Sequence, residues 1–239
     1  MGGTRLTAVC RCGRCEDPTE LGTMLSAMLC RGCGGAVLPA SPGLPSTTWR
    51  CGECGAEEEA GGVETEVREC EASMMDISET ETEKYEQLLA RLRPRFHPHH
   101  FQQLLTKLYL ARSLQGRLTR QQLERKVSLY REYMAVFAVV DPGLTKWRGS
   151  LLYETAKLSL MLGECDLKQG RCSEHEFLAG VEQAGRELEE AVRCLQWEQV
   201  GSEEHQQAGL AAASLHQTRD LLTLATHCKQ KQQADSKHG

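Results

Sequence analysis

Four cysteines near the start of the chain form two identical pairs. Cys30 and Cys33 are separated by two residues, as are Cys51 and Cys54, and 17 residues lie between the pairs. Two such pairs at this separation are typical of a site in which four thiolates surround one Zn²⁺ ion tetrahedrally. The sequence therefore predicts one zinc ion bound by Cys30, Cys33, Cys51 and Cys54.

A glycine follows each pair, at Gly34 and Gly55. A residue without Cβ lets the turn tighten, so that backbone N–H groups can point at the sulfurs. Four sulfur ligands fill every position of the ion and leave none for a water molecule. We therefore expect a structural site, and the sequence assigns no catalytic residue to it.

A second group, Cys10, Cys12 and Cys15, offers three thiolates close together. This is one ligand fewer than tetrahedral zinc requires. Cys70 is the nearest spare cysteine, but nothing in its surroundings indicates a ligand turn. The alternative, which we favour, is a ligand from a segment that this chain does not contain. The prediction is an incomplete second zinc site at Cys10, Cys12 and Cys15.

Other reactive side chains fit structural roles better. His97, His99 and His100 lack cysteine or carboxylate partners at ligand spacing, so we expect them to begin a helix. Two runs of carboxylates have the pattern of a solvent-exposed face, and we assign them no chemistry: Glu57–Glu59, and Glu187, Glu189 and Glu190. Four further cysteines lie singly along the chain, and we expect them to be small buried residues: Cys165, Cys172, Cys194 and Cys228. No catalytic or cofactor-binding residue is predicted.

Composition and charge limit the class of protein. With 40% hydrophobic and 26% charged residues, the chain can bury a core and is not a disordered segment. Its net charge of −5 lies entirely in residues 1–73, which hold 6 basic and 11 acidic groups. This balance disfavours nucleic-acid binding. No membrane-length apolar run and no secretory signal are present, so we expect a cytoplasmic or nuclear protein.

The apolar pattern divides the chain into two parts. Residues 1–73 are rich in Cys, Gly and Pro and show little helical periodicity, whereas the spacing becomes helical beyond Ile77. Six helices are predicted in residues 74–228, followed by a polar tail over 229–239. Their markers are Tyr85 to Leu92, Phe101 to Ala111, a capping box at Thr119 and Gln122, Trp147 to Leu162, a capping box at Ser173 and Glu176, and Ser202 to His227.

The helical part is expected to be a bundle or solenoid of antiparallel pairs, because the predicted loops are short. The third helix carries two apolar stripes, so we place it at the centre of the core. Gly185 and Gly209 lie inside helices and are candidates for close helix contacts. The predicted fold class is mainly α, with a small cysteine-rich N-terminal segment.

Several segments together resemble a known family. The resemblance spans about residues 8–228 and is to SMYD proteins, of the arthropod SmydA type, which are SET-domain protein lysine methyltransferases with a MYND zinc finger. The chain is similar to the cysteine-rich post-SET segment of these proteins and to their tetratricopeptide-like C-terminal domain. The segments that carry it are Cys10–Thr23, Leu25–Cys30, Trp49–Cys51, Leu92–His100 and Val140–Tyr153.

The resemblance implies a role for the incomplete cysteine group. In that family the first three cysteines share a zinc ion with a cysteine of the SET core, and the C-terminal domain helps to close the channel for the methyl donor and lysine. The sequence contains no MYND finger, no Asn-His-Ser-Cys segment and no glycine motif for S-adenosylmethionine. We expect the catalytic body to lie upstream of Met1, and S-adenosylmethionine to bind only where that core is present.

Two functions follow from these expectations. The first is the C-terminal portion of a SET-domain methyltransferase-like protein, which binds zinc, shapes the substrate cleft and does not methylate alone. The alternative is a non-enzymatic zinc-binding module for protein–protein interaction. Both expect a protein substrate or a partner peptide, and neither expects nucleic acid or a membrane.

Overall fold

A computed structural model describes residues 10–42 and 47–235 of the chain, with side chains described as far as Cys228. Within these residues the chain is mainly helical, with a small sheet in the cysteine-rich segment, which confirms the predicted fold class. It divides into two compact units. The N-terminal unit runs to Gln115 and includes Ala135–Pro142, and the C-terminal unit comprises Gly116–Met134 and the chain from Gly143 onward.

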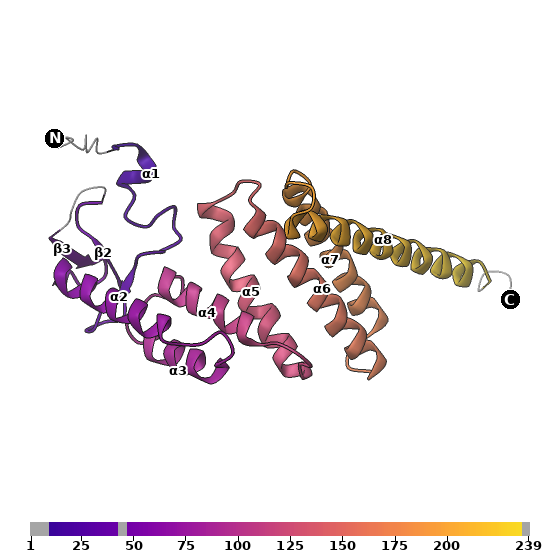
Figure 1. Ribbon diagram of the computed structural model, residues 1–239, viewed down its shortest axis with the longest axis horizontal. Coiled ribbons are helices and arrows are strands. Elements are labelled where there is room, and N and C mark those ends of the chain that lie inside the picture. The colour runs from indigo at the N-terminus through magenta and orange to yellow at the C-terminus, as the bar shows by residue number, and fades with distance from the viewer. Residues whose placement is uncertain (1–9, 43–46, 236–239) are drawn as a thin grey trace. The chain divides into compact units, whose positions relative to one another are not determined.

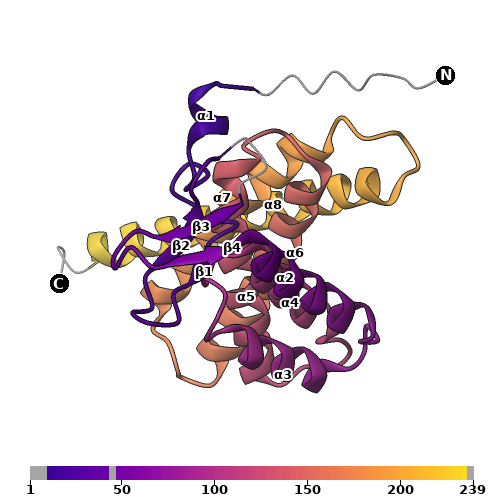
Figure 2. The same ribbon diagram turned by 90° about the vertical axis from the view of Figure 1, so that its left-hand side faces the viewer.

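The first described element of the N-terminal unit is a short helix, α1 (Gly13–Glu16; Figure 1). It is followed by an antiparallel sheet of strand order β1-β2-β3-β4, whose four strands are labelled in Figure 2. The strands are β1 (Met28–Leu29), β2 (Ala36–Pro39), β3 (Thr48–Cys51) and β4 (Glu57–Glu59). Val37 pairs with both Met28 and Cys51, so β2 lies between the strands that end at the two cysteine pairs. Met28 also forms a bridge with Phe96.

Three helices complete this unit: α2 (Ala60–Met75), α3 (Thr82–Leu92) and α4 (Phe101–Ser113). Figure 2 shows α2 continuing directly from β4 beside the sheet. One buried cluster joins the sheet to these helices, because Met28 and Val37 pack with Val63 of α2 and Leu88 of α3. The cysteine-rich sheet therefore shares its core with helices.

The C-terminal unit contains α6 (Lys146–Lys168), α7 (Glu174–Leu195) and α8 (Glu203–Asp235), and the chain enters it through α5 (Arg120–Val140). Alanine and leucine side chains of the three later helices pack together at Ala156, Leu188 and Ala211. Small side chains let helix axes approach closely. The chain thus packs α7 between α6 and α8 (Figure 1).

All six helices predicted beyond Ile77 are present as α3 to α8. Both predicted capping boxes are confirmed. The N–H of Thr119 donates to Gln122 Oε1 (2.9 Å) and the Gln122 N–H donates back to Thr119 Oγ1 (3.3 Å). The same reciprocal pair joins Ser173 and Glu176. Helix α8 continues to Asp235, through part of the predicted polar tail, and residues 236–239 lie outside the described chain.

The third predicted helix, α5, is not the most buried helix of the chain. In α4, nine of 13 residues are buried, among them the polar side chains of Gln102, Gln103 and Thr106. Their hydrogen-bonding groups find local partners, since Thr106 donates to the Gln102 carbonyl (2.7 Å) and Gln103 to that of Phe96 (2.7 Å). Satisfied polar groups of this kind can occupy a core position that the apolar pattern does not reveal.

His100 begins α4, as expected for this histidine cluster. Its Nδ1 accepts a hydrogen bond from the Gln102 N–H (3.1 Å), and its ring packs against Phe96 and Phe101. The side chain is 1% exposed. Burial, with a smaller contribution from the charge of His97, lowers the pKa of His100 to about 3.

We therefore expect the protein to lose stability as the pH falls below about 6.5, the usual pKa of histidine. Between that pH and the folded-state pKa, the unfolded chain binds a proton that the folded chain does not, which costs about 1.4 kcal/mol per pH unit. His100→Asn keeps a capping side chain and removes the titration, so its unfolding free energy should fall less steeply in urea titrations at successive pH values. The exposed His175→Asn is the control. Equal slopes for His100→Asn and the unmodified chain would contradict the expectation.

Candidate metal centre

Two tight turns bring the four paired cysteines together. The Gly34 N–H donates to the Cys30 carbonyl (2.9 Å) and the Gly55 N–H donates to the Cys51 carbonyl (3.1 Å). Both glycines have positive φ, +76° and +73°, a conformation that side chains with a Cβ rarely adopt. The predicted need for glycine after each pair is confirmed.

The four sulfurs lie within 4.8 Å of one another. Contacts cross between the turns, with Cys30 Sγ 3.7 Å from Cys54 Sγ and Cys33 Sγ 3.5 Å from Cys51 Sγ. In a zinc tetrahedron with Zn–S bonds of about 2.3 Å, sulfurs are about 3.8 Å apart. The set of donors therefore has a geometry that suits a metal ion.

Backbone N–H groups favour the thiolate at the first cysteine of each turn. Hydrogen bonds from the N–H groups of Cys33 and Gly32 lower the pKa of Cys30 to about 7. Those of Cys54 and Glu53 lower the pKa of Cys51 in the same way. Since metal ligands bind as thiolates, these N–H groups favour the charged form that Cys30 and Cys51 would need in order to bind a cation.

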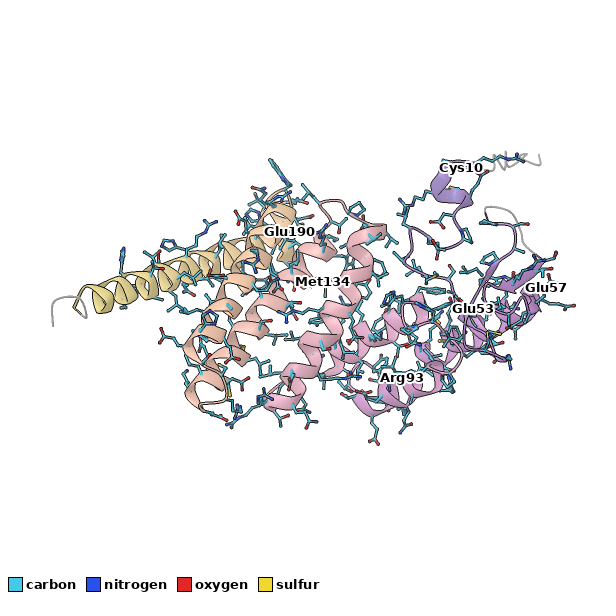
Figure 3. The ribbon with its side chains drawn as sticks, turned by 180° about the vertical axis from the view of Figure 1, so that it is seen from behind. Cys10, Glu53, Glu57, Arg93, Met134 and Glu190 are labelled. Atoms are coloured by element: carbon cyan, nitrogen blue, oxygen red, sulfur yellow. The ribbon has the colours of Figure 1, made fainter. Side chains whose placement is uncertain are left out.

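Gly35 supplies close packing around the sulfurs. Its N–H lies 3.4 Å from Cys33 Sγ. A Cβ at this position would lie 2.5 Å from Cγ of Glu53 and 3.3 Å from Cys51 Sγ. Glu53, labelled in Figure 3, thus closes over a backbone that only glycine fits without displacement.

The second cluster is more open. Cys10, Cys12 and Cys15 also have their sulfurs within 4.8 Å of one another, around the start of α1, near the labelled Cys10 in Figure 3. Cys10 and Cys12 are exposed and Cys15 is half-buried. Among the residues described, no histidine, aspartate, glutamate or further cysteine joins this group. Hydrogen bonds from the Cys15 N–H and then from the Cys10 thiol lower the pKa of Cys12 to about 7.

Cys70, the spare cysteine within the chain, lies elsewhere. It is buried in the core of the N-terminal unit, with its thiol 3.5 Å from Gln102 Oε1. Burial raises the pKa of Cys70 to about 11, so it stays a neutral thiol. The structure thus brings together the three cysteines of the trio and leaves Cys70 apart.

Arg95 anchors the sheet to the helices, a role that the sequence did not reveal. Its guanidinium donates to the carbonyl of Leu29 (2.7 Å), next to Cys30, and to Glu66 of α2 (2.6 Å). It also bonds both carboxylate oxygens of Glu58 in β4. The Arg95 side chain is 12% exposed. One cation therefore ties β1 and β4, the two edge strands of the sheet, to α2.

Replacing Arg95 by alanine should destabilise the N-terminal unit by about 2 kcal/mol. The change leaves the carboxylates of Glu58 and Glu66 without this cation. Breaking a fully buried ion pair in this way costs about 3–5 kcal/mol of stability. The cost is smaller here because both carboxylates are about one quarter exposed to solvent. Thermal and denaturant unfolding measure the effect. Arg93→Ala, at an exposed position two residues away and labelled in Figure 3, should change stability by less than about 0.5 kcal/mol. Equal losses in the two variants would contradict the anchoring role.

The remaining candidates show no catalytic arrangement. Glu57 pairs with Arg50 (2.5 Å), and among the described residues no metal-type cluster includes the three histidines. Of the four single cysteines only Cys194 is buried; Cys165 and Cys172 are half-buried and Cys228 is exposed. The expectation that all four are buried was therefore wrong for three of them.

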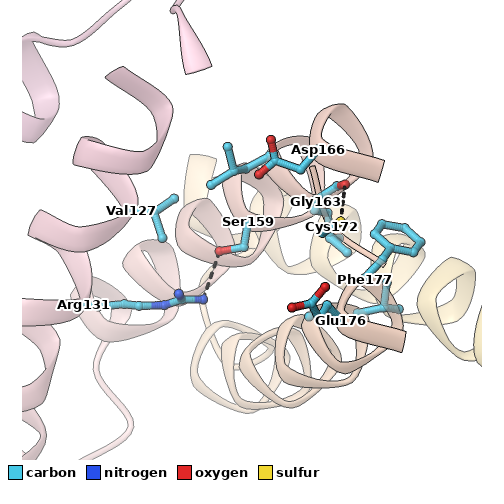
Figure 4. Close-up of a pocket in the computed structure, with 12 residues that line it drawn as sticks. Val127, Arg131, Ser159, Gly163, Asp166, Cys172, Glu176 and Phe177 are labelled. Carbon is cyan, nitrogen blue, oxygen red and sulfur yellow. Dashed lines mark hydrogen bonds between the residues drawn. The ribbon is translucent and has the colours of Figure 1, made fainter. Parts of the chain in front are cut away.

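A cavity of about 220 Å³ lies in the C-terminal unit, between α5, α6 and α7 (Figure 4). Its polar side chains are held by neighbours. Arg131 donates to Ser159 (3.1 Å), and Arg120 followed by Arg171 lowers the pKa of Asp166 to about 2. The Cys172 thiol faces the carbonyl of Gly163 (3.9 Å). Within the lining, no nucleophile lies beside a general base.

None of the described helices has the length and apolar character that a membrane crossing requires.

No protein-family model matches the chain. A segment of 48 residues is 50% identical to SET domain-containing protein SmydA-8, isoform B, of Drosophila melanogaster; it makes up 19% of this chain and 11% of that protein. Isoform A is 49% identical over 47 residues, 19% of this chain and 10% of that isoform. The chain thus matches about a tenth of the length of these curated relatives. About one fifth of it is similar to a SET-domain protein, and its two cysteine clusters have a geometry compatible with zinc.

Proposed function

We propose that this chain is the C-terminal portion of a SET-domain protein lysine methyltransferase-like protein. Zinc at Cys30, Cys33, Cys51 and Cys54 would stabilise the small sheet, and the tetratricopeptide-like helices would shape the cleft for a protein substrate. The observation that carries the proposal is the set of four sulfurs within 4.8 Å of one another, on two glycine turns. The similarity of one segment to SmydA-8 supports the choice of family.

In this proposal the chain supplies binding and shape, and the chemistry belongs to a SET core. Four thiolates would fill the coordination of the first zinc, so that ion has a structural role. Cys10, Cys12 and Cys15 form the post-SET part and hold a second zinc whose fourth ligand comes from the core. S-adenosylmethionine would bind only with that core.

Zinc content and methyl transfer test the proposal. The purified chain under reducing conditions should contain at least one zinc ion per molecule, and a Cys30→Ser, Cys54→Ser double variant should contain one fewer. With S-adenosylmethionine and histone or peptide substrates, the chain alone should show no turnover. Less than one zinc per chain would refute the metal site, and turnover without any other protein would refute the assignment of the chemistry to a separate core.

A second candidate is a non-enzymatic zinc-binding module that receives a partner protein. It is favoured by the large apolar side chains that the helices leave exposed, including Trp197 at 77% and Leu224 at 62%. Adding a SET core in trans separates the candidates. If the added core restores methyl transfer, the first candidate is favoured. If the full chain binds a partner protein and the added core does not strengthen this binding, the second candidate is favoured.

A further inference from the structure

Four large apolar side chains are exposed in two short stretches of the C-terminal unit. Leu144 and Trp147 are 54% and 58% exposed at the start of α6, and Trp197 and Val200 are 77% and 81% exposed between α7 and α8. We call these four residues the tryptophan patch. None of them belongs to either cysteine cluster or to the cavity of Figure 4.

The helix packing brings the two stretches to one end of the unit. The backbone of Gly149 lies directly against Leu195. Gly149 follows Trp147 by two residues, and Leu195 precedes Trp197 by two residues, so the two tryptophans lie near this contact. The start of α8 is fixed at the same end, since Lys146 pairs with Glu204 (3.0 Å) and Ser150 bonds Gln207 (2.7 Å). Glu190, labelled in Figure 3, pairs with Arg148 and marks this end of α7.

The exposed area is large enough to form the centre of an interface. A tryptophan side chain has about 150–250 Å² of surface that it can bury. At their exposed fractions, Trp147 and Trp197 together present roughly 300 Å² to solvent, and Leu144 and Val200 raise this exposed apolar area to about 500 Å². The largest contiguous apolar patch of a typical soluble monomer is about 300–600 Å², and such a patch is often functional. A stable interface covers about 800 Å² on each partner, with aromatic anchors at its centre and a polar rim around them.

The rim of the patch is acidic. Two basic groups of the rim, Lys146 and Arg148, already pair with Glu204 and Glu190, and a third, Arg193, is exposed four residues before Trp197. Glu198 and Glu203 form no ion pair with any residue in the described part of the chain, and the charge of Glu198 contributes to raising the pKa of Lys146, after the larger effect of Glu204. After internal pairing, the rim therefore keeps the two carboxylates of Glu198 and Glu203 against the one cation of Arg193, so it stays net negative.

This charge selects among possible partners. A second copy of the chain would place the same carboxylates against one another, and like charges oppose association. A segment with apolar side chains and flanking lysine or arginine would cover the tryptophans and pair with Glu198 and Glu203. We propose that the tryptophan patch is the docking surface for an amphipathic basic peptide segment of a partner protein. The inference holds under either proposed function, because the patch lies outside both cysteine clusters.

Two labelled peptides of about 16 residues test this inference against the full zinc-loaded chain. Both carry leucine at helical spacing, one with flanking lysines and the other with glutamates at the same positions. Fluorescence anisotropy should give a micromolar Kd for the lysine peptide, weaker at higher salt, and at least tenfold weaker binding of the glutamate peptide.

Variants at the surface complete the test, and their folding can be checked by circular dichroism. Trp197→Ala should weaken binding of the lysine peptide at least tenfold, and a Glu198→Gln, Glu203→Gln double variant should weaken it about threefold and reduce its salt dependence. Met75→Ala, an equally exposed apolar residue of the N-terminal unit, is the matched control and should bind normally. Equal affinity for both peptides, an equal loss in Met75→Ala, no binding at all, or a dimer that Trp197→Ala dissociates would each overturn the proposal.

Discussion

Removing zinc should unfold the β1–β4 sheet while the C-terminal unit keeps its helices. Structural zinc contributes on the order of 10 kcal/mol to the folding of small zinc-binding units. The sheet has little else of comparable strength, since β1 has two residues and β4 three. Cys30 and Cys51 are also members of the apolar core with Met28 and Val37, so a disordered metal site would open that core as well.

Amide hydrogen exchange measures this effect strand by strand. Chelation of the metal, or Cys51→Ser, should remove protection from β1 to β4 and leave protection in α6 and α7 unchanged. Cys228→Ser changes an exposed single cysteine of α8 and is the matched control, with no expected change in either region. Unchanged protection of the sheet after complete metal removal would show that the metal is not what holds the strands.

The two cysteine turns could be predicted because the interactions that form them are local. Each turn consists of a few consecutive residues, and the glycine after each pair is required by a conformation of those residues alone. The same is true of the capping boxes at Thr119 and Ser173, where partners lie three residues apart. Patterns of this length leave a direct trace in the sequence.

Helix α2 was missed for the opposite reason. Its first turns contain Gly61 and Gly62, and each costs about 1 kcal/mol in helix propensity relative to alanine. Few apolar residues mark its face. Val63 and Cys70 nevertheless pack into the core formed by the sheet and α3, so tertiary contacts stabilise a helix that the local sequence disfavours.

Contacts between distant residues were equally hidden. Glu187 reads as a solvated-face residue beside Glu189 and Glu190, but it is 7% exposed and accepts hydrogen bonds from Gln183 (3.0 Å) and Arg131 (3.4 Å). Arg131 lies 56 positions away, and nothing in the local pattern identifies it as the partner. The bonds of Arg95 to Glu66 and Glu58 likewise span 29 and 37 positions.

Close helix contact was expected at the wrong glycines. No atom outside its own helix lies within 4 Å of a Cβ added at Gly209, and at Gly185 the nearest is Thr218 Oγ1 at 3.7 Å, an ordinary contact. The tightest of the described helical glycines is Gly149 in α6, where an added Cβ would lie 2.6 Å from Leu195 Cγ and 2.8 Å from Cys194 Cβ. Which glycine meets a neighbouring helix depends on the packing of α6 against α7, which helix propensity does not encode.

Gly149→Ala should therefore destabilise the C-terminal unit by about 3 kcal/mol, at the upper end of the usual cost of overpacking a core. Leu195 is fully buried and cannot swing away, so α6 and α7 must separate or Leu195 must adopt a poor rotamer. Gly180→Ala is the matched control within α7, because its added Cβ meets no atom within 4 Å outside its own helix. It should stabilise the unit by up to about 1 kcal/mol through helix propensity alone.

Denaturant unfolding of the two variants, followed by helical circular dichroism, compares these effects directly. The expected difference between them is about 4 kcal/mol, with opposite signs relative to the unmodified chain. If both substitutions stabilised the unit, propensity would outweigh packing at Gly149, and the close approach of α6 and α7 there would not exist in solution. Opposite signs would instead show that α6 and α7 approach closely where Gly149 meets Leu195, two residues from each of the tryptophans of the patch.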